Sequence, residues 1–233
     1  MIHVQPFSRL GRFTNDWLNA RHHFSFGSYH DPRRMGVGGL RVWNDDEIAP
    51  GTGFDPHPHR DMEIITYVRD GAITHRDNLG NEGRTEAGDI QVMHAGTGIV
   101  HAEYNLERTP TRLFQIWIMP NRQGVAPGWG TKRFPRQGAG LALLASGRES
   151  DKTADALPLH ADAALYAGTL KAGETVRYAL GAGRVAYLVP ASGRVTVNEV
   201  AAGTRDGVAV AGEPFVDLVA DEEAEIVLVD VAE

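Results

Sequence analysis

Residues 51–71 read GTGFDPHPHRDMEIITYVRDG, a pair of histidines followed directly by an apolar run. The run MEIITYV is short and rich in β-branched residues, which is typical of a strand. His57 and His59 are two residues apart, so on a strand both imidazoles point to one face, with Asp61 and Glu63 on that face if the strand continues. The histidines are therefore either polar residues on a strand surface or half of a metal site.

Short runs of the same kind recur on both sides of this stretch, separated by Gly, Asp and Asn. They are AITHRD (72–77), DIQVMHA (89–95), RLFQIWIM (112–119), VAYLVP (185–190), RVTVNEV (194–200), GVAVA (207–211), FVDLVA (215–220) and EIVLVDV (225–231). Long amphipathic helical patterns are nearly absent. The sequence therefore predicts an all-β protein.

The strand-rich sequence divides into two halves. The stretch from 120 to 140 contains three Pro and five Gly, which interrupt any regular periodicity. The segments 66–93 and 186–210 share one order of features: a strand with Tyr and Val, a Gly turn, an alternating strand, a Gly-containing loop and an acidic turn into another strand. We expect two copies of one small β-barrel or jelly roll, with domains at 1–120 and 141–233 and a linker at 121–140.

Composition limits the function classes. The chain has 233 residues, a formal net charge of -7 and no block of consecutive Lys or Arg, which argues against direct nucleic-acid binding. It has no cysteine, so nitrogen and oxygen atoms must hold any metal. No run resembles a signal peptide or approaches the roughly 20 apolar residues of a membrane helix. We expect a cytoplasmic protein that does not bind membranes.

A second His-containing pair, His101 and Glu103, has the same spacing as the first. If the two strands are antiparallel neighbours, facing Cβ atoms lie roughly 4.5–5.5 Å apart, and one ion could bridge both pairs. Three imidazoles and one carboxylate suit Fe, Mn, Co, Ni, Cu or Zn, and leave two positions open on an octahedral ion. His75 and His94 could lie near this pocket or be ordinary polar strand residues.

The histidines are distributed unequally between the halves. Nine of the ten lie at or before residue 101, and only His160 lies in the second half. We therefore expect one metal per chain, in the N-terminal domain. The interior of the second domain should instead be apolar, with Val195, Val197, Val208 and Val210 among the side chains that fill it. His22, His23 and His30, in the aromatic-rich HHFSFGSYH, are expected to have surface or packing roles.

The opening stretch resembles the first cupin motif, with Gly51, His57, His59 and Glu63 in place and Gly71 one residue late. Through HPHRDMEIITYV (57–68), AGDIQVMHAGTGIVHAEYN (87–105) and LFQIWIMP (113–120), the chain resembles the pirin branch of the cupin superfamily. The segment 23–48 is similar to bacterial pirin-like proteins described as quercetin 2,3-dioxygenases. The resemblance implies a bicupin fold of two face-to-face jelly-roll β-barrels, with metal only in the first.

The resemblance also implies the ligands. The pirin pattern assigns the metal to His57, His59, His101 and Glu103, the set that the spacing proposes. The general second cupin motif fits less well, since a histidine at position 94 replaces its Pro and its His comes two positions late, at 101. This departure leaves Glu63, a ligand in many other cupins, outside the direct ligand set. The expected metal is Fe(II), with Zn, Mn, Co, Ni and Cu as alternatives.

The implied activity is a dioxygenase reaction. In quercetinase-like cupins, O2 opens the central ring of a flavonol such as quercetin and carbon monoxide is released, and Glu103 is the candidate base. The partners are then a flavonoid-like small molecule and O2. One alternative is a metal-dependent, redox-sensing regulator that binds a protein partner, as eukaryotic pirins are described. Another is a metal site with a substrate that is not a flavonoid. The candidate pocket walls are Phe26, Trp43, Phe54, Met93 and Trp117, each of which could equally belong to the core.

Overall fold

The computed structural model describes residues 1–133 and 140–233, and strands dominate both halves of the chain. The N-terminal half contains β2 (Gly11–Thr14), β3 (Leu18–His22), β4 (Leu40–Ile48), β5 (Thr52–His59), β6 (Glu63–Asp70), β7 (Ala72–Asp77), β8 (Glu82–Glu86), β9 (Ile90–His94), β10 (Ile99–Asn105), β11 (Thr111–Ile118) and β12 (Gly128–Lys132). The C-terminal half contains β13 (Ala142–Ser146), β14 (Leu157–Pro158), β15 (Ala163–Leu170), β16 (Thr175–Ala179), β17 (Arg184–Ser192), β18 (Val195–Val197), β19 (Val200–Ala202), β20 (Gly207–Ala211), β21 (Phe215–Ala220) and β22 (Ala224–Ala232). Strand β1 (Ile2–Gln5) and two single-turn 3-10 helices, η1 (Phe7–Arg9) and η2 (Glu149–Asp151), complete the described elements.

Each half consists of a seven-stranded and a four-stranded sheet. The N-terminal sheets have the orders β12-β9-β6-β11-β4-β3-β2 and β5-β10-β7-β8, and the C-terminal sheets have the orders β1-β20-β17-β22-β15-β13-β14 and β16-β21-β18-β19. The run β6 to β9 therefore occupies the same places as the run β17 to β20. This correspondence confirms the internal repeat between 66–93 and 186–210.

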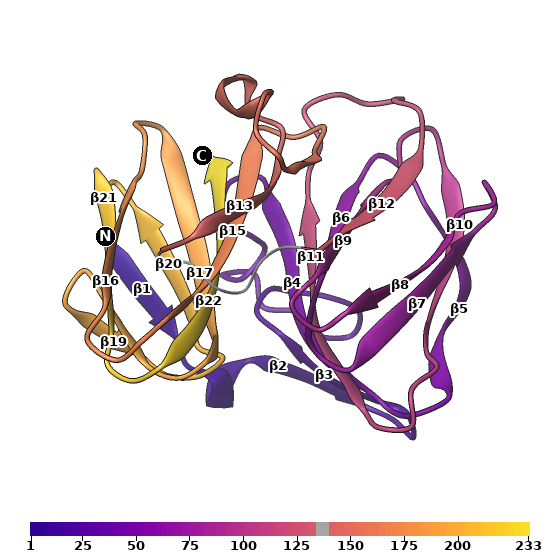
Figure 1. The fold of residues 1–233 in the computed structure, drawn as a ribbon, viewed down its shortest axis with the longest axis horizontal. Coiled ribbons are helices and arrows are strands. Elements are labelled where there is room, and N and C mark those ends of the chain that lie inside the picture. The colour runs from indigo at the N-terminus through magenta and orange to yellow at the C-terminus, as the bar shows by residue number, and fades with distance from the viewer. Residues whose placement is uncertain (134–139) are drawn as a thin grey trace.

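The sheets stack in four layers, with the two seven-stranded sheets in the middle (Figure 1). The core between these two sheets contains Trp43 and Phe114 from the first half and Tyr187 and Val229 from the second. The four-stranded sheets cover the outer faces and enclose a separate core in each half. In the second half that core includes the predicted side chains Val195, Val197, Val208 and Val210, all of them fully buried.

The all-β, two-part architecture agrees with the sequence, but two details differ. Within the described residues, each half is a pair of hydrogen-bonded sheets rather than a closed barrel. The segment 121–140 is also not a plain linker, because β12 within it pairs antiparallel with β9. The sequence did not predict this strand because it contains two glycines, and glycine is uncommon in strand interiors. Residues 134–139 of that segment lie outside the described residues.

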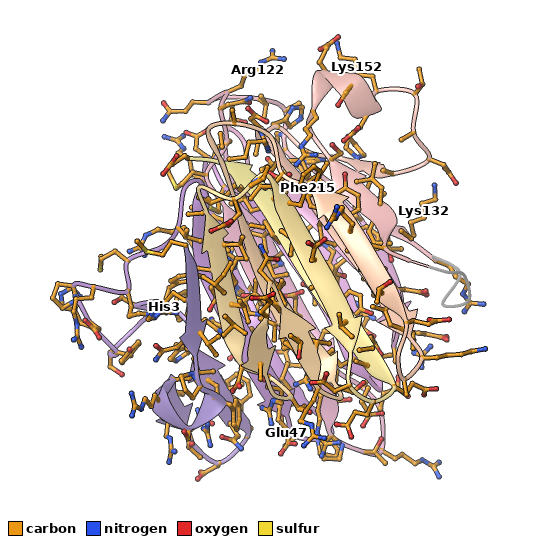
Figure 2. All side chains as sticks on the ribbon, turned by 90° about the vertical axis from the view of Figure 1, so that its left-hand side faces the viewer. His3, Glu47, Arg122, Lys132, Lys152 and Phe215 are labelled. Atoms are coloured by element: carbon orange, nitrogen blue, oxygen red, sulfur yellow. The ribbon has the colours of Figure 1, made fainter. Side chains whose placement is uncertain are left out.

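The first strand belongs to the opposite half of the molecule. Strand β1 pairs antiparallel with β20, with Ile2 opposite Val210, and so forms the edge of the C-terminal sheet. Figure 2 shows β1, with His3 labelled, beside the strands of that half. The first residues of the expected domain 1–120 therefore belong to the sheet of the other domain.

No helix among the described residues is long and apolar enough to cross a membrane.

Candidate metal centre

Strands β5 and β10 are antiparallel neighbours, as the paired spacings required. His57 lies opposite His101, and a bulge then shifts the register so that Phe54 lies opposite Glu103. Asp55 and Pro56 of β5 together span the interval that Ala102 alone spans on β10. Proline is tolerated at such a bulge because no ladder hydrogen bond is needed there. The bulge keeps Phe54 on the same face as both histidines of β5, which all line one cavity.

The three predicted histidine ligands come together. Ring centroids are 4.5 Å apart for His57 and His101, 4.8 Å for His57 and His59, and 5.0 Å for His59 and His101. Each offers a ring nitrogen within 4.8 Å of the other two. These are the separations that imidazoles have when they surround a single small ion.

The state of the rings also suits metal binding. The Nδ1 of His57 is 2.7 Å from the carbonyl oxygen of Asp55, which leaves its Nε2 as the lone-pair atom. The Nε2 of His101 is buried and has no hydrogen-bond partner among the described residues. Burial, and then the neighbouring histidines, lowers the pKa of His59 to about 4 and that of His101 to about 2, so both are neutral at pH 7. Neutral imidazole is the ligating form, and the three residues therefore fit a divalent transition metal.

Glu103 lies beside the histidine group, which consists of His57, His59 and His101, rather than within it. Strand β10 also pairs with β7, where Glu103 lies opposite His75 and His101 lies opposite Asp77. The carboxylate is within 4.8 Å of ring nitrogens of His75 and His101, but it does not share that distance with His57 and His59. The structure thus brings together three of the four predicted ligands, and the assignment of Glu103 to the ion stays a prediction.

Three donors on the facing seven-stranded sheet hold the Glu103 carboxylate. Gln115 donates to Oε2 at 2.9 Å, and Thr66 and Gln91 donate to Oε1. Burial raises the pKa of Glu103 to about 7, although these three hydrogen bonds oppose the rise. The carboxyl group is therefore poised to exchange a proton near neutral pH.

These donors were not among the residues expected at the site, although the sequence does contain a signal for them. The three donors lie in one polar row across the sheet, which also includes Asn44. The row runs over the adjacent strands β4, β11, β6 and β9 through Asn44, Gln115, Thr66 and Gln91. Three of them are single polar residues inside apolar runs. A polar residue at a position where alternation requires burial must find a partner, and here that partner is Glu103.

The expectation that Asp61 and Glu63 share the face of the histidines is wrong. Strand β5 ends at His59, and Asp61 has a φ of 45°, which reverses the chain before β6. The Glu63 carboxylate instead contacts Nδ1 of His94 at 2.6 Å and accepts the backbone N–H of His160 at 3.0 Å. Glu63 therefore joins the two halves of the molecule and lies outside the histidine group. His94, which the sequence left ambiguous, belongs to this junction.

A cavity of about 460 Å³ opens beside His57 and His59. Of the five candidate wall residues, Phe26, Phe54 and Trp117 line it, and Trp117 also lies edge-on to His59 at 5.0 Å. The other two, Trp43 and Met93, are buried in core clusters. A concave site with aromatic walls and a few polar groups is typical of small-molecule binding.

Asp46 and His22 are further polar residues of this cavity that sequence analysis did not single out as ligand-binding. His22 is buried and its Nδ1 is 2.8 Å from Oδ1 of Asn44. Asp46 is also buried, and its Oδ1 has no hydrogen-bond partner among the described residues. Burial, followed by the charges of Asp45 and Glu103, raises the pKa of Asp46 well above its ordinary range. The surroundings of Asp46 in the cavity wall thus favour its uncharged form.

Asp46→Asn is expected to stabilise the metal-free protein at pH 8 and to have little effect below pH 4. Because the folded-state pKa is raised, the folded protein holds this proton while the unfolded chain loses it, so stability falls as the pH rises above the unfolded pKa. The slope from one such group is up to about 1.4 kcal/mol per pH unit. Urea unfolding of both proteins from pH 4 to pH 8 measures it. Parallel free-energy curves would show that Asp46 is charged in the folded protein.

Two family models match this chain, one in each half. The family model described as Pirin matches residues 4–118, and the model described as Quercetinase C-terminal cupin domain matches residues 143–231. A pirin-like protein of Caulobacter vibrioides is 60% identical over 234 residues, which cover 100% of this chain and 100% of that protein. A quercetin 2,3-dioxygenase of Escherichia coli is 40% identical over 232 residues, which cover 99% of this chain and 98% of that protein.

A solved structure of a bacterial pirin is similar to this chain over its whole length. The crystal structure of bacterial pirin YhhW from Escherichia coli, in complex with nickel(II), has a TM-score of 0.94 at 39% identity, covering 100% of this chain and 99% of that one. At this identity and coverage, the similarity extends over both halves and includes the strands that bear the three histidines. The chain therefore belongs to the pirin family.

Proposed function

We propose that this protein is a metal-dependent dioxygenase that opens the central ring of a flavonol such as quercetin with O2 and releases carbon monoxide. The observation that carries the proposal is the position of the histidine group, which forms one wall of a cavity large enough for a small molecule. The names of the relatives, quercetin 2,3-dioxygenase among them, support the same reaction class. His57, His59, His101 and Glu103 would hold one divalent metal, which we expect to be Fe(II).

The cavity residues have distinct roles in this proposal. Phe26, Phe54 and Trp117 bind the faces and edges of a flat aromatic substrate and exclude water from it. A bound divalent ion would lower the pKa of a substrate hydroxyl and bring the substrate and O2 together. Glu103, which a bound cation would keep ionised, is the candidate acceptor of the hydroxyl proton. Gln115 both lines the cavity and donates to Glu103, so it connects the base to the substrate site.

The same cavity weighs against the regulatory alternative. A redox-sensing protein needs a metal whose state alters an outer surface, and it has no need of an aromatic chamber beside the ligands. Here two of the three histidines face such a chamber. A cavity of this kind also serves a substrate that is not a flavonoid, and direct assay distinguishes that case.

Metal-reconstituted protein is expected to consume quercetin and O2 in equal amounts in air, with release of carbon monoxide. The loss of the visible absorption band of quercetin measures the rate, and elemental analysis should give one metal per chain. A stoichiometry near two would contradict a single site in the N-terminal half.

The matched control is the same protein after chelation, which should lose turnover and regain it when metal is restored. Loaded protein that leaves quercetin and other flavonols unchanged would refute the proposed reaction. A metal content of one per chain in that inactive protein would still support the histidine site.

A further inference from the structure

His75 lies between a carboxylate and the histidine group. Its Nδ1 is 3.4 Å from Nδ1 of His101, and its Nε2 is 3.0 Å from Oδ2 of Asp77. The His75 side chain is fully buried and its ring stacks on Trp129, with centroids 4.8 Å apart and an interplanar angle of 8°. The ring therefore has a fixed position and two defined polar contacts.

The donor and acceptor in each of these two contacts follow from the chemistry of Asp77, His75 and His101. Asp77 is an acceptor, and the backbone N–H groups of Leu79 and Asn81 and the Asn81 side chain hold it in place. An ionised carboxylate requires an N–H at Nε2 of His75, so Nδ1 of a neutral His75 carries the lone pair. That lone pair can accept only if Nδ1 of His101 carries the proton. The Nε2 of His101 is then left unprotonated, and this buried nitrogen has no hydrogen-bond partner within residues 1–133 and 140–233.

We propose that His75 is a positioning residue for the metal centre, which sets the tautomer and orientation of His101 through the hydrogen-bonded series Asp77, His75 and His101. The inference rests on the proposed metal site, because it concerns how one of the histidine ligands is prepared for the ion. Metal-binding histidines commonly donate their other ring N–H to such a partner, which raises their basicity as ligands. In this chain the partner is a second imidazole, supported in turn by a carboxylate.

Two substitutions separate the hydrogen bond from the packing. His75→Phe keeps a flat ring against Trp129 but removes the acceptor, whereas His75→Asn places an oxygen acceptor near the position of Nδ1. We expect His75→Phe to weaken Co(II) binding by about 10- to 100-fold and His75→Asn to restore much of the loss. Titration of the metal-free proteins with Co(II), followed by its absorption bands, gives both the affinity and the ligand environment.

The control is His94→Phe, which removes another carboxylate-paired histidine of the same half and should leave Co(II) affinity unchanged. Thermal melting of each metal-free variant reports its folding. If His75→Phe does not fold, Asp77→Asn provides the test, because both rings stay in place and affinity should still fall by about tenfold.

The outcomes distinguish the inference from the proposed function. Wild-type protein that binds no Co(II) would refute the metal site itself. Wild-type protein that binds Co(II), with unchanged affinity in His75→Phe, would refute only the role of His75. Equal weakening in His75→Phe and His75→Asn would indicate packing alone and overturn the inference. Loss of one nitrogen ligand from the bound Co(II) in both His75 variants would make His75 a ligand and overturn it as well.

Discussion

Glu103→Gln is expected to lower the rate of quercetin turnover by about 10²-fold or more and to weaken metal binding as well. The substitution keeps the shape of the side chain but removes the charge and the proton acceptor. It also places an amide N–H₂ against donors of the facing sheet, Gln91 and Gln115, which now donate to the carboxylate. Steady-state kinetics and metal content of the purified variant measure the two effects.

Glu63→Gln is the matched control, since it makes the same change in the carboxylate that the general cupin motif, unlike the pirin pattern, would assign to the metal. Glu63 contacts His94 and His160 rather than the histidine group, so we expect metal to be retained and the rate to fall by no more than about tenfold. The reverse result, with metal lost in Glu63→Gln and both metal and activity kept in Glu103→Gln, would show that the chain uses the general cupin ligand set.

Substitution of His57, His59 or His101 by Ala is expected to abolish metal binding and activity while leaving the fold largely intact. Each half has its own apolar core, and a third core joins the two seven-stranded sheets, so folding does not depend on an ion as it does in a zinc finger. Metal analysis, activity and cooperative melting of the metal-free proteins test this expectation. Loss of cooperative melting in all three variants would make the metal structural.

The sequence predicted the strands and the histidine group because both depend on local spacing. His57, His59 and His101 needed only alternation along two strands and antiparallel pairing between them. The position of Glu103 depended on more, because a bulge at Asp55 and Pro56 changes what lies opposite it. A bulge adds one residue to one strand and so shifts its pairing with the neighbouring strand. The sequence of one strand does not reveal where this shift occurs.

Long-range contacts account for the other differences. Glu63 follows the histidines closely in sequence, yet the turn at Asp61 directs it toward the opposite half, where its partner His160 is 97 residues away. His75 was ambiguous because its role depends on strand β7 lying beside β10. Strand β12 escaped notice because Gly128 and Gly130 lack the side chains by which a strand is recognised.

The pairing of β1 with β20 also has a consequence for the order in which the molecule forms. About 200 residues separate Ile2 from its partner Val210, and closing a loop of that length costs entropy that no local contact offsets. The sheets of the N-terminal half can assemble during synthesis without this strand. The edge position beside β20 can be filled only after β20 itself has left the ribosome, so β1 joins the C-terminal sheet after the N-terminal sheets can form and ties the two halves together.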